Sequence, residues 1–199
     1  MTNENKPLTL DEAKVKGYLT SDYINGDYKY RDENRVEHLI RNGKEIATGN
    51  DVRVFDNDDY AYEDEKGIWH LIRDGKEIAK GLNVFSYPNG DYDYKDEDRV
   101  EHLIRNGKEI ATGGYVFSHE NGYYEYRDEL DIHHLMNNGE EIATGNDVRV
   151  FDNDDYAYED DNGIWHLMRD GEELAKGYDV YSFDDGSYVY EDDEGTHFG

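Results

Sequence analysis

The sequence predicts an all-β fold of antiparallel repeats, and two periodic motifs carry that prediction. The string His-Leu-Ile-Arg-Asn-Gly-Lys-Glu-Ile-Ala-Thr-Gly begins at His38, and close versions follow in steps of 32 residues at His70, His102, His134 and His166. A Tyr-x-Tyr motif keeps the same step and begins at Tyr28, Tyr60, Tyr92, Tyr124, Tyr156 and Tyr188. A fixed period of this length is typical of repeat architectures.

Each unit contains two turn signals that separate short β-prone runs. One signal is Asn42-Gly43 and its later counterparts, and the other is Asn25-Gly26 and its counterparts, which include Asn57-Asp58. Asn-Gly and Asp-Gly suit the type I′ turn of a two-residue hairpin. The runs between them, such as Val52–Phe55 and Ile68–Arg73, are rich in residues that favour strands. We therefore expect four antiparallel strands per unit, each of about five residues.

The number of units predicts a small β-propeller of five or six blades, closed by the termini. Units start near residues 28, 60, 92, 124, 156 and 188, and a sixth unit is divided between residues 17–27 and 188–199. Such a division is what a propeller needs when both ends of the chain complete one blade. The alternative is an open β-meander or solenoid array, in which each unit contacts only its neighbours. We expect residues 1–16 to form an N-terminal segment, a short helix at Leu10–Lys16 or a cap, and residues 17–199 a single β-repeat domain.

The two faces of each strand carry different residues, because side chains alternate along a strand. Both faces of Ile68–Arg73 are largely apolar, which predicts a central strand buried on both sides. In the Tyr-x-Tyr strands the Tyr face is expected to be core or half-core. The opposite face is variable and mostly polar, so we expect it to be solvated and the strand to be peripheral. Its residues are Lys29, Ala61, Asp93, Glu125, Ala157 and Val189.

Composition excludes several classes of function. The 199 residues include 21 Lys and Arg against 49 Asp and Glu, a formal charge of −28, so binding of nucleic acid through a basic patch is not expected. The chain has no Cys, which excludes disulfides, Cys–zinc sites and a Cys nucleophile. No apolar run approaches the roughly 18 to 20 residues of a membrane span. The N-terminal sequence lacks an apolar signal core, so we expect a cytoplasmic protein without membrane contact.

Catalysis, cofactors and metals are not expected either. The sequence has no nucleophile elbow, phosphate loop or zinc-protease motif, and repeated residues argue against one asymmetric active site. The His series could bind metal or sense pH, but a hydrogen-bonded structural His copied with its unit is the simpler interpretation. The acidic turns Asp56–Asp59 and Asp152–Asp155 offer oxygen ligands for Ca²⁺. They lack the EF-hand spacing, so we expect them to be solvated turns.

The segment Gly67-Ile-Trp-His-Leu-Ile-Arg-Asp-Gly-Lys-Glu-Ile-Ala79 resembles bacterial WG-type repeats, which share a Gly-x-Trp, an apolar pair and then Gly-Lys-Glu with an aliphatic residue. The resemblance covers about half of each unit and implies an interaction module. The chain departs from the pattern, because the Trp occurs only at Trp69 and Trp165 and no Gly follows it. The Ala-Thr-Gly at 111–113 is also similar to choline-binding repeats, without their paired aromatics. Neither resemblance assigns a functional residue.

Charge is distributed unevenly along the chain. Residues 1–123 carry a formal charge of −9 and residues 124–199 one of −19, in part because Asn137 stands where an earlier unit has Arg41. A field of this kind can steer a basic partner. We therefore expect a non-catalytic interaction module that binds a basic protein or peptide through the acidic C-terminal half. The alternatives are a lectin-like propeller with one equivalent ligand pocket per repeat and an acidic DNA mimic. The residues expected to contact the partner are Glu140, Glu141, Asp152, Asp154, Asp155, Glu172 and Glu173.

Overall fold

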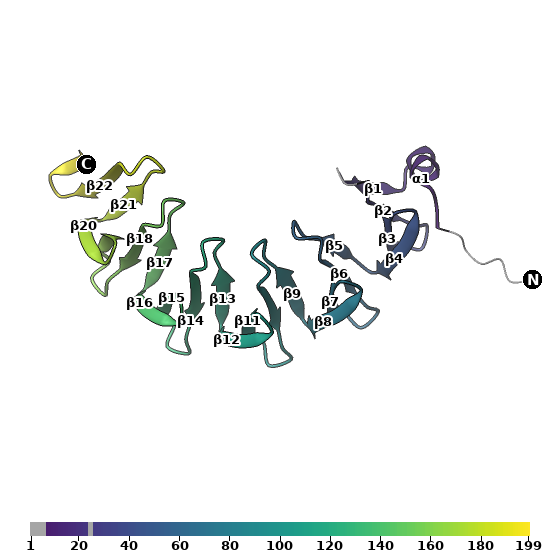
Figure 1. Ribbon diagram of the computed structural model, residues 1–199, viewed down its shortest axis with the longest axis horizontal. Helices are drawn as coiled ribbons and strands as arrows, with labels where there is room; N and C mark the ends of the chain where they lie inside the picture. Colours follow the sequence, from purple (N-terminus) through teal and green to yellow (C-terminus); the bar gives the residue numbers. More distant parts are fainter. Residues whose placement is uncertain (1–6, 24–25) are drawn as a thin grey trace, which may run out of the picture. The chain divides into compact units, whose positions relative to one another are not determined.

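A computed structural model describes residues 7–23 and 26–199 and shows one short helix followed by a succession of antiparallel sheets (Figure 1). The helix α1 spans Leu10–Lys16. The strands of the described residues form six sheets in chain order, five with four strands and the last with three. In every sheet, strands that are consecutive in the chain are also neighbours in space, so each sheet is a meander. We number these sheets one to six.

The strands occupy equivalent positions from sheet to sheet. The first strands are β1 (Leu19–Asp22), β5 (Val52–Val54), β9 (Asn83–Ser86), β13 (Tyr115–Ser118), β17 (Asp147–Val150) and β21 (Asp179–Ser182). The second strands are β2 (Tyr28–Arg31), β6 (Tyr60–Glu63), β10 (Tyr92–Lys95), β14 (Tyr124–Arg127), β18 (Tyr156–Glu159) and β22 (Tyr188–Asp192). The third strands are β3 (Glu37–Arg41), β7 (Trp69–Arg73), β11 (Glu101–Arg105), β15 (His133–Asn137), β19 (Trp165–Arg169) and β23 (Gly195–Phe198). The fourth strands are β4 (Lys44–Gly49), β8 (Lys76–Gly81), β12 (Lys108–Gly113), β16 (Glu140–Gly145) and β20 (Glu172–Gly177).

The two turn signals give two different turns. Between third and fourth strands both residues have positive φ, as at Asn42 (51°) and Gly43 (71°), which fits the predicted type I′ turn. Between first and second strands only the second residue of the signal does, as at Asp58 (67°). The amide of Phe55 there donates to the carbonyl of Asp59 and the amide of Asp58 donates to the carbonyl of Phe55. The prediction of a two-residue turn was wrong at this site, because a three-residue loop with a left-handed last residue closes the hairpin.

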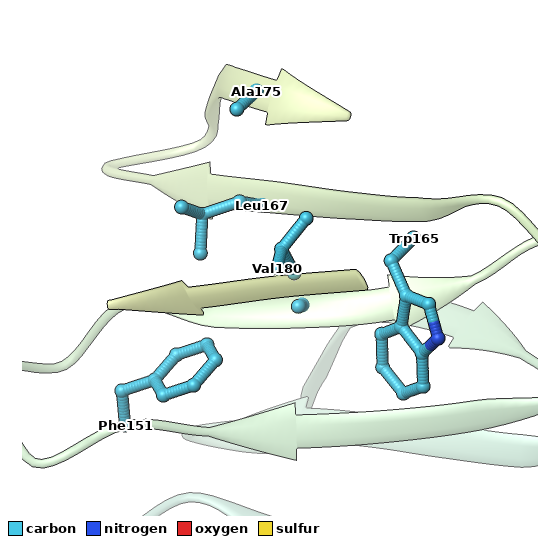
Figure 2. Close-up of a cluster of buried hydrophobic side chains, with 6 residues drawn as sticks. Phe151, Trp165, Leu167, Ala175 and Val180 are labelled. Atoms are coloured by element: carbon cyan, nitrogen blue, oxygen red, sulfur yellow. The ribbon is translucent and has the colours of Figure 1, made fainter. Parts of the chain in front are cut away.

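Neighbouring sheets pack face to face, as sheets one and two and sheets five and six do. Leu39 and Ala47 of sheet one pack against Val52 and Tyr60 of sheet two. Figure 2 shows the equivalent cluster of sheets five and six, in which Leu167 and Trp165 of sheet five lie against Val180 of sheet six. The first Tyr of the motif is buried at Tyr28, Tyr60, Tyr124 and Tyr156, which confirms the core role expected of this face. The all-β antiparallel repeat fold is thus confirmed, with propeller-like blades as its unit.

Helix α1 covers the outer face of sheet one. Thr9 caps the helix and forms a capping box with Glu12, and Gly17 ends it in the left-handed conformation. Ala13, which is fully buried, packs against Tyr28 and Tyr30. The segment before the helix is tied down as well, because the Tyr28 hydroxyl donates to the Leu8 carbonyl at 2.8 Å. The Tyr face of the first sheet is therefore shielded from water by the N-terminal segment.

A glycine ends every fourth strand because the next sheet passes very close to it. A Cβ placed on Gly145 would lie 2.2 Å from the backbone oxygen of Glu159, and one on Gly113 would lie 2.1 Å from that of Arg127. The following residue uses the same oxygen, since the amide of Asn146 donates to the Glu159 carbonyl at 2.9 Å. The Thr-Gly and Lys-Gly endings of the repeat thus fix the step from one sheet to the next.

The face opposite the Tyr residues is buried in sheets two to five and half-buried in sheets one and six, which corrects the prediction that it is solvated. Ala61 and Ala157 have no exposed surface, and Asp93 and Glu125 are 7% and 8% exposed. The Tyr-x-Tyr strand pairs with a strand on each side, so it is an interior strand of its sheet and not a peripheral one. The Arg53 Cζ lies 3.7 Å from the centre of the Trp69 ring. The small Ala61 is the strand partner of Arg53, on β6. Alternation in the sequence could not reveal that another layer covers this face.

Closure of a ring by the termini stays a prediction. Strand β1 pairs with β2 in sheet one, and β22 pairs with β21 and β23 in sheet six. Each sheet begins one strand before the Tyr-x-Tyr motif. The two parts of the divided sequence unit therefore belong to different sheets, β1 to sheet one and β22 with β23 to sheet six. The chain forms two compact units, Met1–Ser86 with Tyr94–Glu97 and Tyr87–Asp93 with Asp98–Gly199. Within the described residues no helix has the length and apolar content to span a membrane.

Candidate functional site

The seven carboxylates predicted to bind a partner lie at or beside two kinds of turn in sheets four and five. In a four-stranded meander the turn between the first two strands and the turn between the last two lie at the same end of the sheet. Asp152, Asp154 and Asp155 belong to the β17–β18 turn, and the other four residues begin β16 and β20 directly after their turns. Residues of both kinds of turn line one cavity there, including Tyr123, Asp154 and Asp170. We call this region the turn end of sheets four and five.

Asp155 differs from the other predicted contact residues, because it is buried and paired within the fold. It is 2% exposed and accepts from Arg169 through Nε at 2.8 Å and a terminal nitrogen at 2.7 Å. The Ser182 hydroxyl of the next sheet and the Asn153 amide donate to the same carboxylate. Burial raises the pKa of Asp155, but these hydrogen bonds outweigh it and hold the pKa below its ordinary value. The residue links two sheets through Arg169 and Ser182.

The same network recurs in earlier sheets. Asp59 accepts from Arg73 and Ser86, and Asp91 accepts from Arg105 and Ser118. This network was not predicted, although it leaves a signal in the sequence. An Asp directly before the Tyr-x-Tyr motif is followed 14 residues later by an Arg in these units.

Sheet four breaks the pattern. Tyr123 stands in place of the Asp and Asn137 in place of the Arg. The space around them is a cavity of about 470 Å³, whose wall includes Asp154, Tyr156 and Asp170. The Asn121 amide donates to the Asp154 carboxylate at 2.9 Å, and the Tyr123 hydroxyl reaches the Asp154 carbonyl at 3.5 Å. The lost Asp–Arg pair thus leaves an opening in an acidic region.

Glu141 and Glu173 contact the repeated His residues. His134 Nδ1 lies 2.7 Å from Glu141 Oε2, and His166 Nδ1 lies 2.6 Å from Glu173 Oε2. Each His ring also stacks on the second Tyr of the motif, at 4.6 Å between the His134 and Tyr126 centroids. The equivalent Nδ1–Glu contact occurs at His38, His70 and His102. The interpretation of the His series as hydrogen-bonded structural residues is therefore confirmed.

Glu141 and Glu173 stay exposed beside their histidines, and the remaining four predicted residues are exposed as well. Glu140, Asp152, Asp154 and Glu172 are all exposed. Sheets one to three have Lys44, Lys76 and Lys108 at the position that Glu140 and Glu172 occupy. The exposed acidic surface at the turn end therefore arises in part from reversal of charge at one repeat position.

The part of the chain that the structure describes contains no set of side chains arranged to bind a metal ion. Among those residues no group of three or more His, Asp or Glu side chains is placed to hold a metal ion. In the acidic turns one carboxylate of each is already engaged, since Asp59 and Asp155 pair with arginines.

A second polar centre lies inside sheet four, at Glu125. This residue lines a cavity of about 360 Å³ with Tyr115, His133 and Asp147. Burial raises the pKa of Glu125 to about 7, the Tyr115 hydrogen bond at 3.3 Å opposes the shift, and Asp147 adds to it. His119 Nε2 lies 3.8 Å from Glu125 Oε1. Burial lowers the pKa of His119 to about 4. Sequence analysis missed this centre because it placed Glu125 in solvent.

Comparison with known proteins adds no family. No family model matches the chain. No curated protein matches it either. The resemblance to WG-type repeats thus stays unconfirmed.

Similar solved structures are WD40 propellers or assemblies. The "WD40 beta propeller domain of Doa1" is 9% identical, covers 91% of this chain and 77% of its own, and has a TM-score of 0.36. The "C-Terminal WD40 Domain Of Sif2" is 12% identical, covers 82% and 62%, and has a TM-score of 0.44. A chain of a "Mitotic Checkpoint Complex" is 8% identical, covers 90% and 72%, and has a TM-score of 0.38. At these scores the likenesses support no inference about partners or activity.

Proposed function

We propose that this protein is a non-catalytic interaction module that binds a basic protein or peptide through the turn end of sheets four and five. The observation that carries the proposal is the exposed set Glu140, Asp152, Asp154 and Glu172 at that end. Two of these replace the lysines of earlier units, so the local field is strongly negative. A negative field of this kind raises the association rate of a positively charged partner and falls with salt.

A non-catalytic role fits how the other polar groups are used. Asp155 is buried and paired with Arg169, and Glu141 and Glu173 contact histidines at the surface. The carboxylates left in solvent lie on a surface and can attract charge.

The decisive experiment reverses the charge of the two residues that replace lysines of earlier units, Glu140 and Glu172. Glu140→Lys with Glu172→Lys restores the residue type of sheets one to three, and it should weaken binding of a peptide rich in Lys and Arg by about tenfold or more at low salt. The matched control is Glu65→Lys with Glu97→Lys, which changes the total charge equally at exposed positions of other turns. This control should reduce affinity only about twofold, because it leaves the carboxylates of the turn end in place.

Two results would contradict the proposal. If both variants lose affinity equally, the whole charge of the protein attracts the peptide and the turn end has no special role. If binding by the unmodified chain does not weaken as salt rises, the partner is not recognised by charge. A lectin-like module would give the second result, with several equivalent sites.

A further inference from the structure

Two identical stretches of sequence build the same surface in two different settings. Residues 45–64 and 141–160 do not differ at any position. Each stretch supplies a fourth strand and the first hairpin of the next sheet, so the turn wall Asp56–Tyr60 recurs as Asp152–Tyr156. The residues of the preceding sheet that face this wall do differ, because Asp27 and Arg41 stand where the second setting has Tyr123 and Asn137. The first setting is therefore an internal reference for the second.

In the first setting the guanidinium of Arg41 lies against the wall. Its Nε donates to Asp27 at 2.7 Å and a terminal nitrogen donates to the main-chain carbonyl of Asp58 at 3.1 Å. Its Cζ lies 5.8 Å from the centre of the Tyr60 ring. The wall thus offers a carbonyl acceptor and an aromatic face to a guanidinium.

Two other sheets repeat the hydrogen bond to the turn carbonyl, and one of them repeats the aromatic contact. Arg105 donates to the Gly122 carbonyl at 2.9 Å and lies 5.3 Å from the Tyr124 ring centre. Arg169 donates to the Gly186 carbonyl at 2.9 Å. The turn carbonyl of the following sheet is therefore a guanidinium acceptor for Arg41, Arg105 and Arg169.

In the second setting the arginine is missing and its space is open. Asn137 is three heavy-atom positions shorter than Arg, and the cavity of about 470 Å³ lies between it and the wall residues Asp154 and Tyr156. Burial raises the pKa of Tyr123, and the charges of Asp154, Asp170 and Asp155 raise it further, so negative charge surrounds the opening. Arg169 also lines the cavity, but it is bound to Asp155, which offsets its positive charge.

We propose that this cavity receives an arginine side chain of the basic partner. The guanidinium would donate to the Asp154 carbonyl, as Arg41 does to Asp58, and lie over the Tyr156 ring, as Arg41 does over Tyr60. The carboxylates of Asp154 and Asp170 would supply the charge that Asp27 supplies to Arg41. Lysine is a poorer occupant, because its ammonium is a point charge without a planar face. This inference rests on the proposed function and names the side chain that the acidic surface selects.

The first test compares three peptides that differ at one residue. Peptides with a central Arg, Lys or citrulline are titrated into the full chain at low salt, with calorimetry and the NMR signals of Tyr123 and Tyr156 as readouts. The Arg peptide should bind about tenfold more tightly than the citrulline peptide and several-fold more tightly than the Lys peptide. Equal affinity for Arg and Lys with strong salt dependence would overturn the cavity proposal and leave the proposed function standing. Failure of all three peptides to bind would overturn both.

The second test fills the cavity and opens its counterpart. Tyr123→Asp with Asn137→Arg recreates the pair of the first setting and should remove the preference for Arg at an unchanged or higher melting temperature. Asp27→Tyr with Arg41→Asn should open an equivalent cavity beside the identical wall and raise the stoichiometry from one Arg peptide to two. An unchanged preference in the first variant would refute the proposal. So would an unchanged stoichiometry in a folded second variant.

Discussion

Two positions of the repeat change together, the middle residue of Tyr-x-Tyr and the first residue of the third strand. Where the middle residue of Tyr-x-Tyr is Ala61 or Ala157, the third strand begins with Trp69 or Trp165 and an Arg stacks on the indole at 3.7 Å. Where that residue is Lys29, the third strand begins with Glu37 and the two side chains pair at 3.2 Å. A small residue makes room for the indole and guanidinium, whereas a charged one needs a polar partner in the same layer.

Glu125 gives a pH dependence that belongs to this scale. Its folded-state pKa of about 7 lies above the ordinary carboxyl value of 4.5, so its contribution to stability is complete below pH 4.5 and is lost as pH rises through 7. Glu125→Gln removes this loss, and the variant should therefore gain on the wild type by roughly 3 kcal/mol in unfolding free energy between pH 4 and pH 8. Urea titrations across that range measure the gain.

The groups that face Glu125 are Tyr115, His119, His133 and Asp147, so the comparison needs a control. Glu129→Gln removes an exposed carboxylate of the next turn and should leave the pH dependence close to that of the wild type. A constant difference between Glu125→Gln and the wild type across the range would show that the buried carboxyl does not titrate there.

Single elements of the fold follow from local sequence to different extents. The Asn-Gly and Asp-Gly turns between third and fourth strands were predictable, because positive φ at both positions demands such residues. The turn at Asn57-Asp58 was not, since its three-residue loop depends on hydrogen bonds between Phe55 and Asp59. The glycine at the end of each fourth strand is set by a neighbouring sheet, which a local pattern does not contain.

Adjacent glycines test that last point. Gly113→Ala places a Cβ 2.1 Å from the Arg127 backbone oxygen and should cost about 1–3 kcal/mol of unfolding free energy, because backbone must shift to relieve the clash. Gly114→Ala meets nothing closer than the Arg127 side chain at 3.7 Å and should change stability by less than about 0.5 kcal/mol. Thermal and chemical denaturation measure both, and equal effects would refute the close-approach explanation.

The whole molecule carries far more negative than positive charge. Forty-nine Asp and Glu face 21 Lys and Arg, so repulsion among carboxylates opposes the compact state. The melting temperature should therefore rise by several degrees from about 20 to 500 mM NaCl, as the Debye length shrinks. A fall would mean that ion pairs such as Asp155–Arg169 outweigh the repulsion.

Calcium chloride at matched ionic strength separates screening from binding. We expect it to add nothing to the effect of NaCl, because the turn carboxylates Asp59 and Asp155 are already paired with arginines. An additional rise would reveal a cation site in the acidic turns, since a ligand of the folded state stabilises it.

The sequence alone determined the period, the strands, the antiparallel hairpins and the burial of the Tyr face, because these depend on alternation and turn residues within about 30 neighbouring positions. It also located the acidic half that the proposed function uses. Tertiary structure decided which polar residues are free to bind. It buried Asp155 and Glu125, covered the face opposite the Tyr residues, and left Asn137 beside an open cavity. The reason is physical. The exposure of a side chain and its ion pairs depend on the neighbouring sheet, and the sequence of a single strand does not specify how sheets pack.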